Sequence, residues 1–267
     1  MTNTAEAVER LITAGFATAR IDTRDIEALA RVLDNSLEFF RRPATRKLRH
    51  SGPDANYGYR PMGIEYSVTP DSPDRNECFT LWSDRTDLIP EADELSALTD
   101  ALLAWRTWCM DFTRKLIQEC ADRYRGTYVS FAAASHLQVN NCLPTGPERE
   151  LLQDRHEDGH LLTILHATAP GLEIFVDGSP RPIVTAANEV LVMPGSILAA
   201  MTDGHIAPLY HQVRNLRLAS RQSVMYFVNP ELAEPLLPWV GAERTGDLRS
   251  AVRANPLAFG LPAVEEL

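Results

Sequence analysis

The chain has 267 residues, 36 of them acidic and 26 basic, and its formal net charge at pH 7 is -10. This length is enough to bury a large hydrophobic core. The charge argues against a broad nucleic-acid interface, because phosphate binding needs concentrated Lys and Arg. The first residues lack a basic region followed by an apolar one, and no apolar run approaches the ~18 residues of a membrane span. We therefore expect a globular, cytoplasmic protein with neither a nucleic-acid nor a membrane partner.

The first half of the chain contains three helix-forming patterns. A short helix is expected over residues 6–14, ending near Gly15, and a brief apolar segment follows at 16–19. A second helix is expected over 25–40, with Thr23 as its cap and Pro43 beyond its end. Over residues 93–124 apolar side chains recur with alternating spacings of three and four, which predicts a long helix buried against a sheet. A coiled coil is the alternative interpretation of that stripe.

Between the second and third helices, from 49 to 85, frequent Gly and Pro residues predict loops and short strands. Aromatic and charged side chains are dense in this segment, and such loops can line the mouth of a pocket. The alternative is an ordinary solvated surface. We expect substrate contacts from this segment and from the strand that follows the long helix, at Tyr57, Tyr59, Arg60, Glu65, Tyr66 and Gln138.

After Gly126 the pattern changes to short strands separated by turns. They are expected at residues 137–140, 161–165, 172–176, 189–193, 197–201 and 223–228. Several short strands at this spacing favour a barrel or a jelly roll. A last helix is expected over 248–253. The four cysteines form no C-x-x-C pair, so reduced thiols are expected at Cys78, Cys109, Cys120 and Cys142.

The triplet His156-Glu157-Asp158 is a candidate metal site. In an extended strand, side chains at i and i+2 point to the same face, so His156 and Asp158 can reach one ion. His211, on a later strand, would complete two imidazoles and one carboxylate, the ligand set of non-haem Fe(II) oxygenases. A lone H-x-D triplet is a weak signal, and most histidines are surface or hydrogen-bonded residues. The order and spacing of the strands make the metal site the favoured interpretation.

Arg221 and Ser223 follow His211 and share one face of the last strand. A guanidinium that points into a barrel needs an anion, and its planar fork suits a carboxylate. A dicarboxylate such as 2-oxoglutarate would suit this position, with its distal carboxylate on Arg221 and Ser223. The alternative is a structural salt bridge between Arg221 and an internal acid.

From about residue 15 to residue 230 the sequence resembles the isopenicillin N synthase-like branch of the Fe(II)/2-oxoglutarate-dependent oxygenases. The resemblance rests on the segments 156–165 and 171–172, on the triplets at 211–213 and 221–223, and on weaker matches at 15–16, 39–47 and 58–59. It implies a double-stranded β-helix, or jelly roll, supported by N-terminal helices and the long backing helix. It also implies Fe(II) on His156, Asp158 and His211, with 2-oxoglutarate and O2 as cosubstrates.

The chain departs from the family pattern where a tyrosine or asparagine commonly helps to hold the cosubstrate. This chain has Gln138-Val139-Asn140-Asn141 there, and Asn140 is the candidate for that role, with Asn141 as the alternative. The strand that commonly precedes the Gly-Phe segment is also missing.

The resulting expectation is one oxygenase domain over 1–267, with helical support and substrate loops at 1–130, a jelly-roll core at 131–230 and an extension at 231–267. It would hydroxylate, desaturate or cyclise a small amino-acid-like, peptide or natural-product substrate. One alternative is an iron oxidase that works without 2-oxoglutarate, like the isopenicillin N synthase itself. A second alternative is a non-catalytic jelly-roll protein that binds a small ligand.

Overall fold

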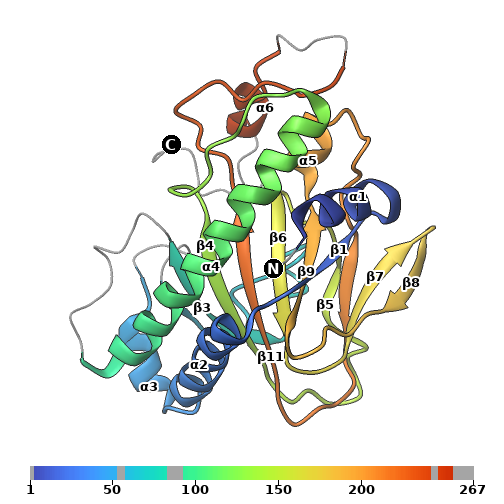
Figure 1. Cartoon of the computed structure of the whole chain (residues 1–267). Helices are drawn as coiled ribbons and strands as arrows, with labels where there is room; N and C mark the ends of the chain where they lie inside the picture. Colours follow the sequence, from blue (N-terminus) through green and yellow to red (C-terminus); the bar gives the residue numbers. More distant parts are fainter. Residues whose placement is uncertain (1–2, 53–57, 83–92, 242–245, 255–267) are drawn as a thin grey trace.

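The computed structural model describes residues 3–52, 58–82, 93–241 and 246–254, and two antiparallel sheets form its centre (Figure 1). The larger sheet has the strand order β1 (Ala17–Arg20), β9 (Glu189–Pro194), β6 (Leu162–Ala167), β11 (Arg221–Val228), β4 (His136–Cys142), β3 (Asn76–Trp82) and β2 (Gly58–Arg60). The smaller sheet has the order β5 (Leu151–His156), β10 (His211–Arg214), β7 (Leu172–Val176) and β8 (Ser179–Pro182). The predicted jelly-roll architecture is confirmed.

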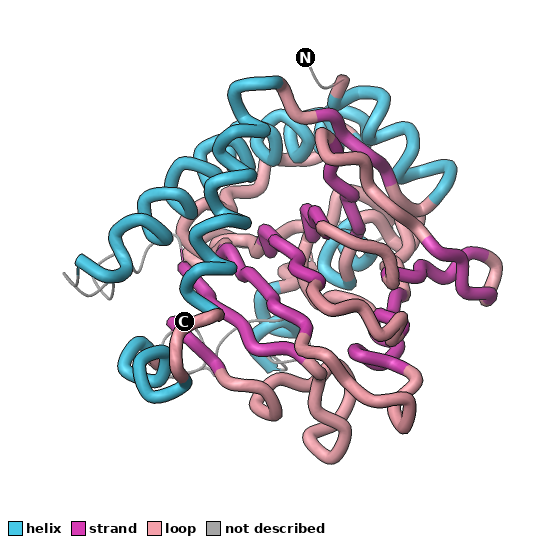
Figure 2. The backbone as a smooth tube through the Cα atoms, turned by 90° about the horizontal axis from the view of Figure 1, so that it is seen from below, coloured by secondary structure: helices cyan, strands magenta, loops and turns pink. Residues whose placement is uncertain are grey.

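Helices cover the outer face of the larger sheet. They are α1 (Thr4–Ala14), α2 (Thr23–Phe40) and α4 (Asp93–Tyr124), and both α1 and α2 pack against α4. Most of the helical segments gather along one side of the strands when the molecule is seen from below (Figure 2). The remaining helices are short: α3 (Ala44–Lys47), the 3₁₀ helix η1 (Leu48–His50), α5 (Ser196–Met201) and α6 (Arg249–Ala254).

The apolar stripe of α4 is buried, which confirms that this helix packs within the protein. Trp105, Leu116 and the two thiols Cys109 and Cys120 are at most 2% exposed. They belong to a large core between the helices and the outer face of the larger sheet. A second, smaller core lies between the two sheets and includes Leu165, Met193, Val213 and Met225. All four cysteines are free and buried.

The register of the larger sheet arranges its inner face in rows. His136 of β4 is opposite Phe227 of β11 and Trp82 of β3. Two residues along, Gln138 is opposite Met225 and Thr80; two further, Asn140 is opposite Ser223 and Cys78. Arg221 is opposite Cys142 in the last row. Because side chains alternate between faces with a period of two, all these residues face the smaller sheet.

Several local predictions are corrected by the structure. Residues 197–201, predicted as a strand, lie in helix α5, because their carbonyls and amides bond within one turn of helix. The N-cap of α2 is Asp22 rather than Thr23, which is the first helical residue, and α2 ends at Phe40 before Pro43. The H-x-D triplet does not open a strand: β5 ends at His156, and Asp158 lies in the loop that follows.

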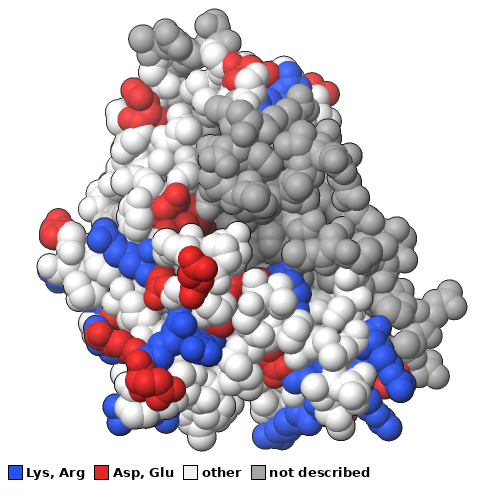
Figure 3. Space-filling view, turned by 180° about the vertical axis from the view of Figure 1, so that it is seen from behind, with Lys and Arg blue, Asp and Glu red and all other residues white. Residues whose placement is uncertain are grey.

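Strand β3, in a segment expected to hold only loops and short strands, has seven residues, all of them buried. Strand β5, which ends at the first residue of the metal motif, is not among the strands predicted from the sequence. On the surface, acidic and basic side chains of described residues are interspersed on the face opposite to that of Figure 1 (Figure 3). Among the described residues, no helix combines the length and apolar character needed to cross a bilayer.

Candidate metal centre and its pocket

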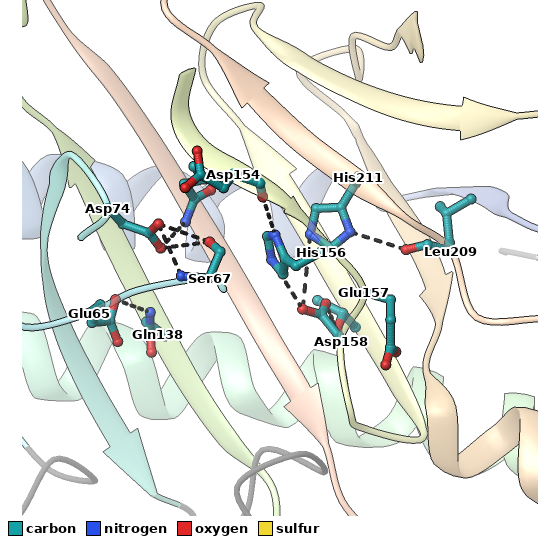
Figure 4. Close-up of polar contacts among 12 residues, drawn as sticks. Glu65, Ser67, Asp74, Gln138, Asp154, His156, Glu157, Asp158, Leu209 and His211 are labelled. Carbon is teal, nitrogen blue, oxygen red and sulfur yellow. Dashed lines mark hydrogen bonds and ion pairs between the residues drawn. The ribbon is translucent and has the colours of Figure 1, made fainter. Parts of the chain in front are cut away.

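The three candidate metal ligands come together at one edge of the smaller sheet. His156 ends β5 and is paired with His211, the first residue of β10. Asp158 turns back from the following loop, so that its Oδ1 lies 3.7 Å from Nε2 of His156 and 3.9 Å from Nε2 of His211. One ligand atom from each residue lies within 4.8 Å of the others (Figure 4). The three side chains could therefore hold one metal ion.

Both imidazoles are oriented by backbone carbonyls. Nδ1 of His156 lies 2.7 Å from the carbonyl oxygen of Asp154, and Nδ1 of His211 lies 3.2 Å from that of Leu209. A carbonyl oxygen only accepts, so each Nδ1 carries the proton and each Nε2 presents its lone pair toward Asp158. Metal-binding histidines commonly have this outer arrangement, which sets the tautomer and the direction of the ring.

The electrostatics of His211 and Asp158 match the charge states that a metal requires. Burial lowers the pKa of His211 to about 4, so its ring is neutral at pH 7. Burial alone would raise the pKa of Asp158, but His211, His156 and a hydrogen bond from Thr163 Oγ1 together lower it, so the carboxylate is ionised. Neutral imidazole and ionised carboxylate are the ligand forms of a bound metal.

Helix α5 holds the loop that carries Asp158. The amides of Ser196 and Ile197 donate to the carbonyl oxygens of Asp158 and His160, at 3.0 and 3.2 Å. Gly195 packs so tightly against the loop that a Cβ there would lie 2.1 Å from the oxygen of His160 and 2.6 Å from that of Asp158. A glycine is therefore required at 195, and the first turn of α5 determines where Asp158 lies.

A cavity of about 620 Å³ extends from these ligands between the two sheets. Arg221 and Ser223 line it and are each 3% exposed. Among described residues, the only side-chain partner of the Arg221 guanidinium is the Cys142 thiol, 3.6 Å from Nη1, and Nε has none. The alternative of an internal salt bridge is therefore not observed among the described residues. A buried cation without a carboxylate is costly. This end of the cavity fits a ligand with a carboxylate.

Asn140 is opposite Ser223, in the row next to that of Arg221, and its Oδ1 accepts a 2.9 Å hydrogen bond from Nε2 of Gln138. Gln138 also donates to Glu65 Oε2 at 3.0 Å and accepts from Arg60 at 2.9 Å. Arg60 and Glu65 form an ion pair. Arg60, Glu65, Gln138 and Asn140 thus form one connected polar network on the cavity wall.

Of the remaining predicted substrate residues, Tyr66 lines the cavity mouth and is 48% exposed. Tyr59 does not line the cavity, and this expectation is corrected. Its side chain lies on the opposite face of β2, where its hydroxyl donates to Glu77 and its ring packs on Phe39. Neighbouring residues of a strand point to opposite faces of the sheet, so Tyr59 points away from the cavity that Arg60 lines. Tyr57 lies outside the described residues.

The sequence analysis missed most of the remaining cavity wall, including its aromatic side chains Trp82, His136, His160 and Phe227. Three of them, Trp82, His136 and Phe227, form one row across β3, β4 and β11. The period of two would have identified His136 from Gln138 and Phe227 from Ser223. His160 follows Asp158 by two residues in an irregular loop, where no periodicity applies.

Comparisons with known proteins agree with this site. A family model described as 2OG-Fe(II) oxygenase superfamily matches residues 134–230, which contain the three candidate ligands and Arg221. The 1-aminocyclopropane-1-carboxylate oxidase 1 of Arabidopsis thaliana is 33% identical over 92 residues; this match spans 33% of the chain and only 30% of that protein's length.

Two solved structures show the same fold at low sequence identity. A full-length protein of Neurospora crassa, solved in complex with alpha-KG, has a TM-score of 0.76 and 19% identity, covering 94% of this chain and 90% of the Neurospora protein. The Arabidopsis thaliana dioxygenase for auxin oxidation 1, in its 2-oxoglutarate complex, has a TM-score of 0.69 and 19% identity, covering 91% of this chain and 96% of the other.

Proposed function

We propose that this chain is a 2OG-Fe(II) oxygenase, which uses Fe(II), 2-oxoglutarate and O2 to oxidise a small organic substrate. The observation that carries the proposal is the buried guanidinium of Arg221, which has no carboxylate partner among the described residues and lines the same cavity as His156, Asp158 and His211. A dicarboxylate that chelates a metal needs one end of the cavity to bind its free carboxylate and three ligands that hold the metal nearby. This cavity has both.

In this proposal each side chain has a defined role. His156, Asp158 and His211 hold Fe(II) from one side and leave its other side to small ligands. Arg221 and Ser223 bind the distal carboxylate of 2-oxoglutarate, while Asn140 is near enough in the register to contact it. When bound, the metal and 2-oxoglutarate supply the activation of O2 and the oxidising power. The protein orients the substrate and shields the cavity from bulk water.

A small substrate is supported by the cavity, whose volume of about 620 Å³ is within the range of small-molecule sites and must also hold 2-oxoglutarate. One structure of similar fold is described as a dioxygenase for auxin oxidation, which is a small-molecule reaction. We propose the whole chain, 1–267, as one oxygenase unit. The proposed reaction is hydroxylation, desaturation or cyclisation of a small amino-acid-like, peptide or natural-product substrate.

The test is an anaerobic titration of the purified protein with Fe(II) and then 2-oxoglutarate. We expect the weak visible charge-transfer band of the iron chelate to appear, and Asp158→Ala to abolish it by removing a ligand. Arg214→Met, which removes an arginine outside the cavity, is the matched control and should keep the band. Iron binding without any band would contradict the proposal and favour an iron oxidase that uses no 2-oxoglutarate, for which turnover yields no succinate.

A further inference from the structure

The cavity has a second half that neither the metal ligands nor Arg221 occupies, and one side of it is aromatic. The ring of His136 stacks on Trp82, with centroids 4.4 Å apart and an interplanar angle of 15°. The ring centroid of Phe227 lies 4.9 Å from that of His136 and 4.5 Å from that of His160. We call Trp82, His136, His160 and Phe227 the aromatic wall. Such a surface favours a flat ring, which can stack or meet it edge to face.

The hydrogen bonds around His160 determine which of its nitrogens can bind a ligand. Nδ2 of Asn229 donates to the carbonyl oxygen of Ala134 at 3.1 Å, so its Oδ1 is the atom that lies 2.7 Å from Nδ1 of His160. An amide oxygen only accepts, so Nδ1 carries the proton. In the neutral ring Nε2 is then an acceptor. A ligand in the cavity can satisfy it by donating an N–H or O–H.

The charges of this half argue against an anionic substrate. Arg60, the one cation of the polar network, is already bound to Glu65 and Gln138. Asp74 and Glu157 also line the cavity, but they lie near the metal ligands, where His156 acts on the pKa of both carboxyls. Among the described residues that line the cavity, Arg221 is then the one cation left for a carboxylate, and 2-oxoglutarate would occupy it in the loaded site. No Lys or Arg is therefore left for a carboxylate of the substrate.

We propose that this half of the cavity binds an uncharged, flat ring that donates one hydrogen bond to Nε2 of His160. The proposal rests on the proposed function, in which the ring belongs to the substrate. Asn229, held by Ala134, is the positioning residue that keeps His160 in the accepting tautomer. Arg60 is not free to receive a substrate carboxylate, because Glu65 already occupies its guanidinium.

The test uses three ring compounds on the protein loaded anaerobically with Fe(II) and saturating 2-oxoglutarate, so that Arg221 is occupied. They are 2-pyridone, which is flat, neutral and carries an N–H; 1-methyl-2-pyridone, which lacks the N–H; and benzoate, which is flat and anionic. Calorimetric titration should show 2-pyridone binding about tenfold more tightly than 1-methyl-2-pyridone, the effect of one net hydrogen bond. Benzoate should bind more weakly than 2-pyridone.

Two variants assign the hydrogen bond. His160→Phe keeps a flat ring but removes the acceptor, so it should weaken 2-pyridone about tenfold and leave 1-methyl-2-pyridone unchanged. His205→Phe, at an exposed histidine outside the cavity, is the matched control and should change neither. The ¹⁵N shifts of His160 should show a protonated Nδ1 in the wild type and a mixture of tautomers in Asn229→Ala.

The proposal is overturned if benzoate binds as tightly as 2-pyridone, if no probe binds, if His160→Phe weakens both pyridones equally, or if Nε2 is protonated. A failure of the proposed function is separate, since it would appear as the absence of the iron chelate band in the wild type. The pyridone titrations can then be repeated on the metal-free protein, where His160 and the aromatic wall are still present.

Discussion

Replacing Arg221 by Met should have opposite effects on the free and the ligand-bound protein. The side chain is 3% exposed, and among the described residues its guanidinium contacts only a thiol, which is a weak acceptor. Without 2-oxoglutarate it is a buried cation that lacks a counter-charge. Met has a similar length and no charge, so Arg221→Met should stabilise the free protein and abolish its response to 2-oxoglutarate.

The magnitudes follow from burial and pairing. Replacing a buried ion pair by apolar side chains of similar volume is neutral or stabilises proteins by about 1–4 kcal/mol, and Arg221 lacks even the partner carboxylate among the described residues. Arg221 faces a cavity rather than closely packed apolar atoms, so we expect the lower half of that range. Removing one partner of a buried charged contact costs about 2–5 kcal/mol of binding free energy, or roughly 30-fold to several thousandfold in the Kd for 2-oxoglutarate. At a concentration of about 100 Kd, the wild type should gain ~2.7 kcal/mol from the ligand.

Urea unfolding of the wild type and the variant, anaerobically with Fe(II) and with or without 2-oxoglutarate, measures both effects. The matched control is Arg214→Met, because Arg214 makes ion pairs with Glu150 and Glu173 outside the cavity. It should change the free energy of unfolding by less than about 1 kcal/mol and keep the response to 2-oxoglutarate. The reasoning is refuted if Arg221→Met destabilises the free protein, or if the variant still gains stability from 2-oxoglutarate as the wild type does.

Three further outcomes are expected. Gly195→Ala should lower the affinity for Fe(II) by roughly 10- to 100-fold, because the added Cβ displaces the carbonyls of Asp158 and His160; unchanged affinity in a metal titration would contradict the role of α5. Burial holds the pKa of His136 well below its ordinary value of 6.5. The ring of His136 stays neutral in the folded protein, whereas in the unfolded chain it takes up a proton below about pH 6.5. The contribution of His136 to the free energy of unfolding is therefore fully present above about pH 6.5 and decreases as the pH falls, by up to ~1.4 kcal/mol per pH unit. His136→Phe should reduce that slope in urea midpoints measured between about pH 7 and pH 5, and an identical slope would refute the assignment. Glu65→Gln should free Arg60 of its carboxylate and raise the affinity for benzoate about tenfold; calorimetry showing no increase would mean that Glu65 does not exclude anions.

The sequence alone was sufficient for features that depend on short spacings. The apolar repeat over 93–124 predicts the face that α4 buries, because helical periodicity determines which side chains lie on one side. The period of two places Arg221 and Ser223 on one face of β11 together, and the structure has both in the cavity. The motif at 156–158 likewise places two ligand types within reach of one ion, although the loop after β5, rather than the strand, brings Asp158 back.

Only the tertiary structure decided which face of each strand meets the cavity. Tyr59 and Arg60 are neighbours in the sequence, yet Tyr59 packs in the helical core and Arg60 lines the cavity. Nothing local distinguishes the two faces of β2, because the choice depends on which layer lies on each side. His160 and Asn229 are 69 residues apart, and their hydrogen bond sets a tautomer that no sequence pattern encodes. Local spacing therefore determined the candidate ligands, while the packing of the two sheets and α5 determined the environment in which they act.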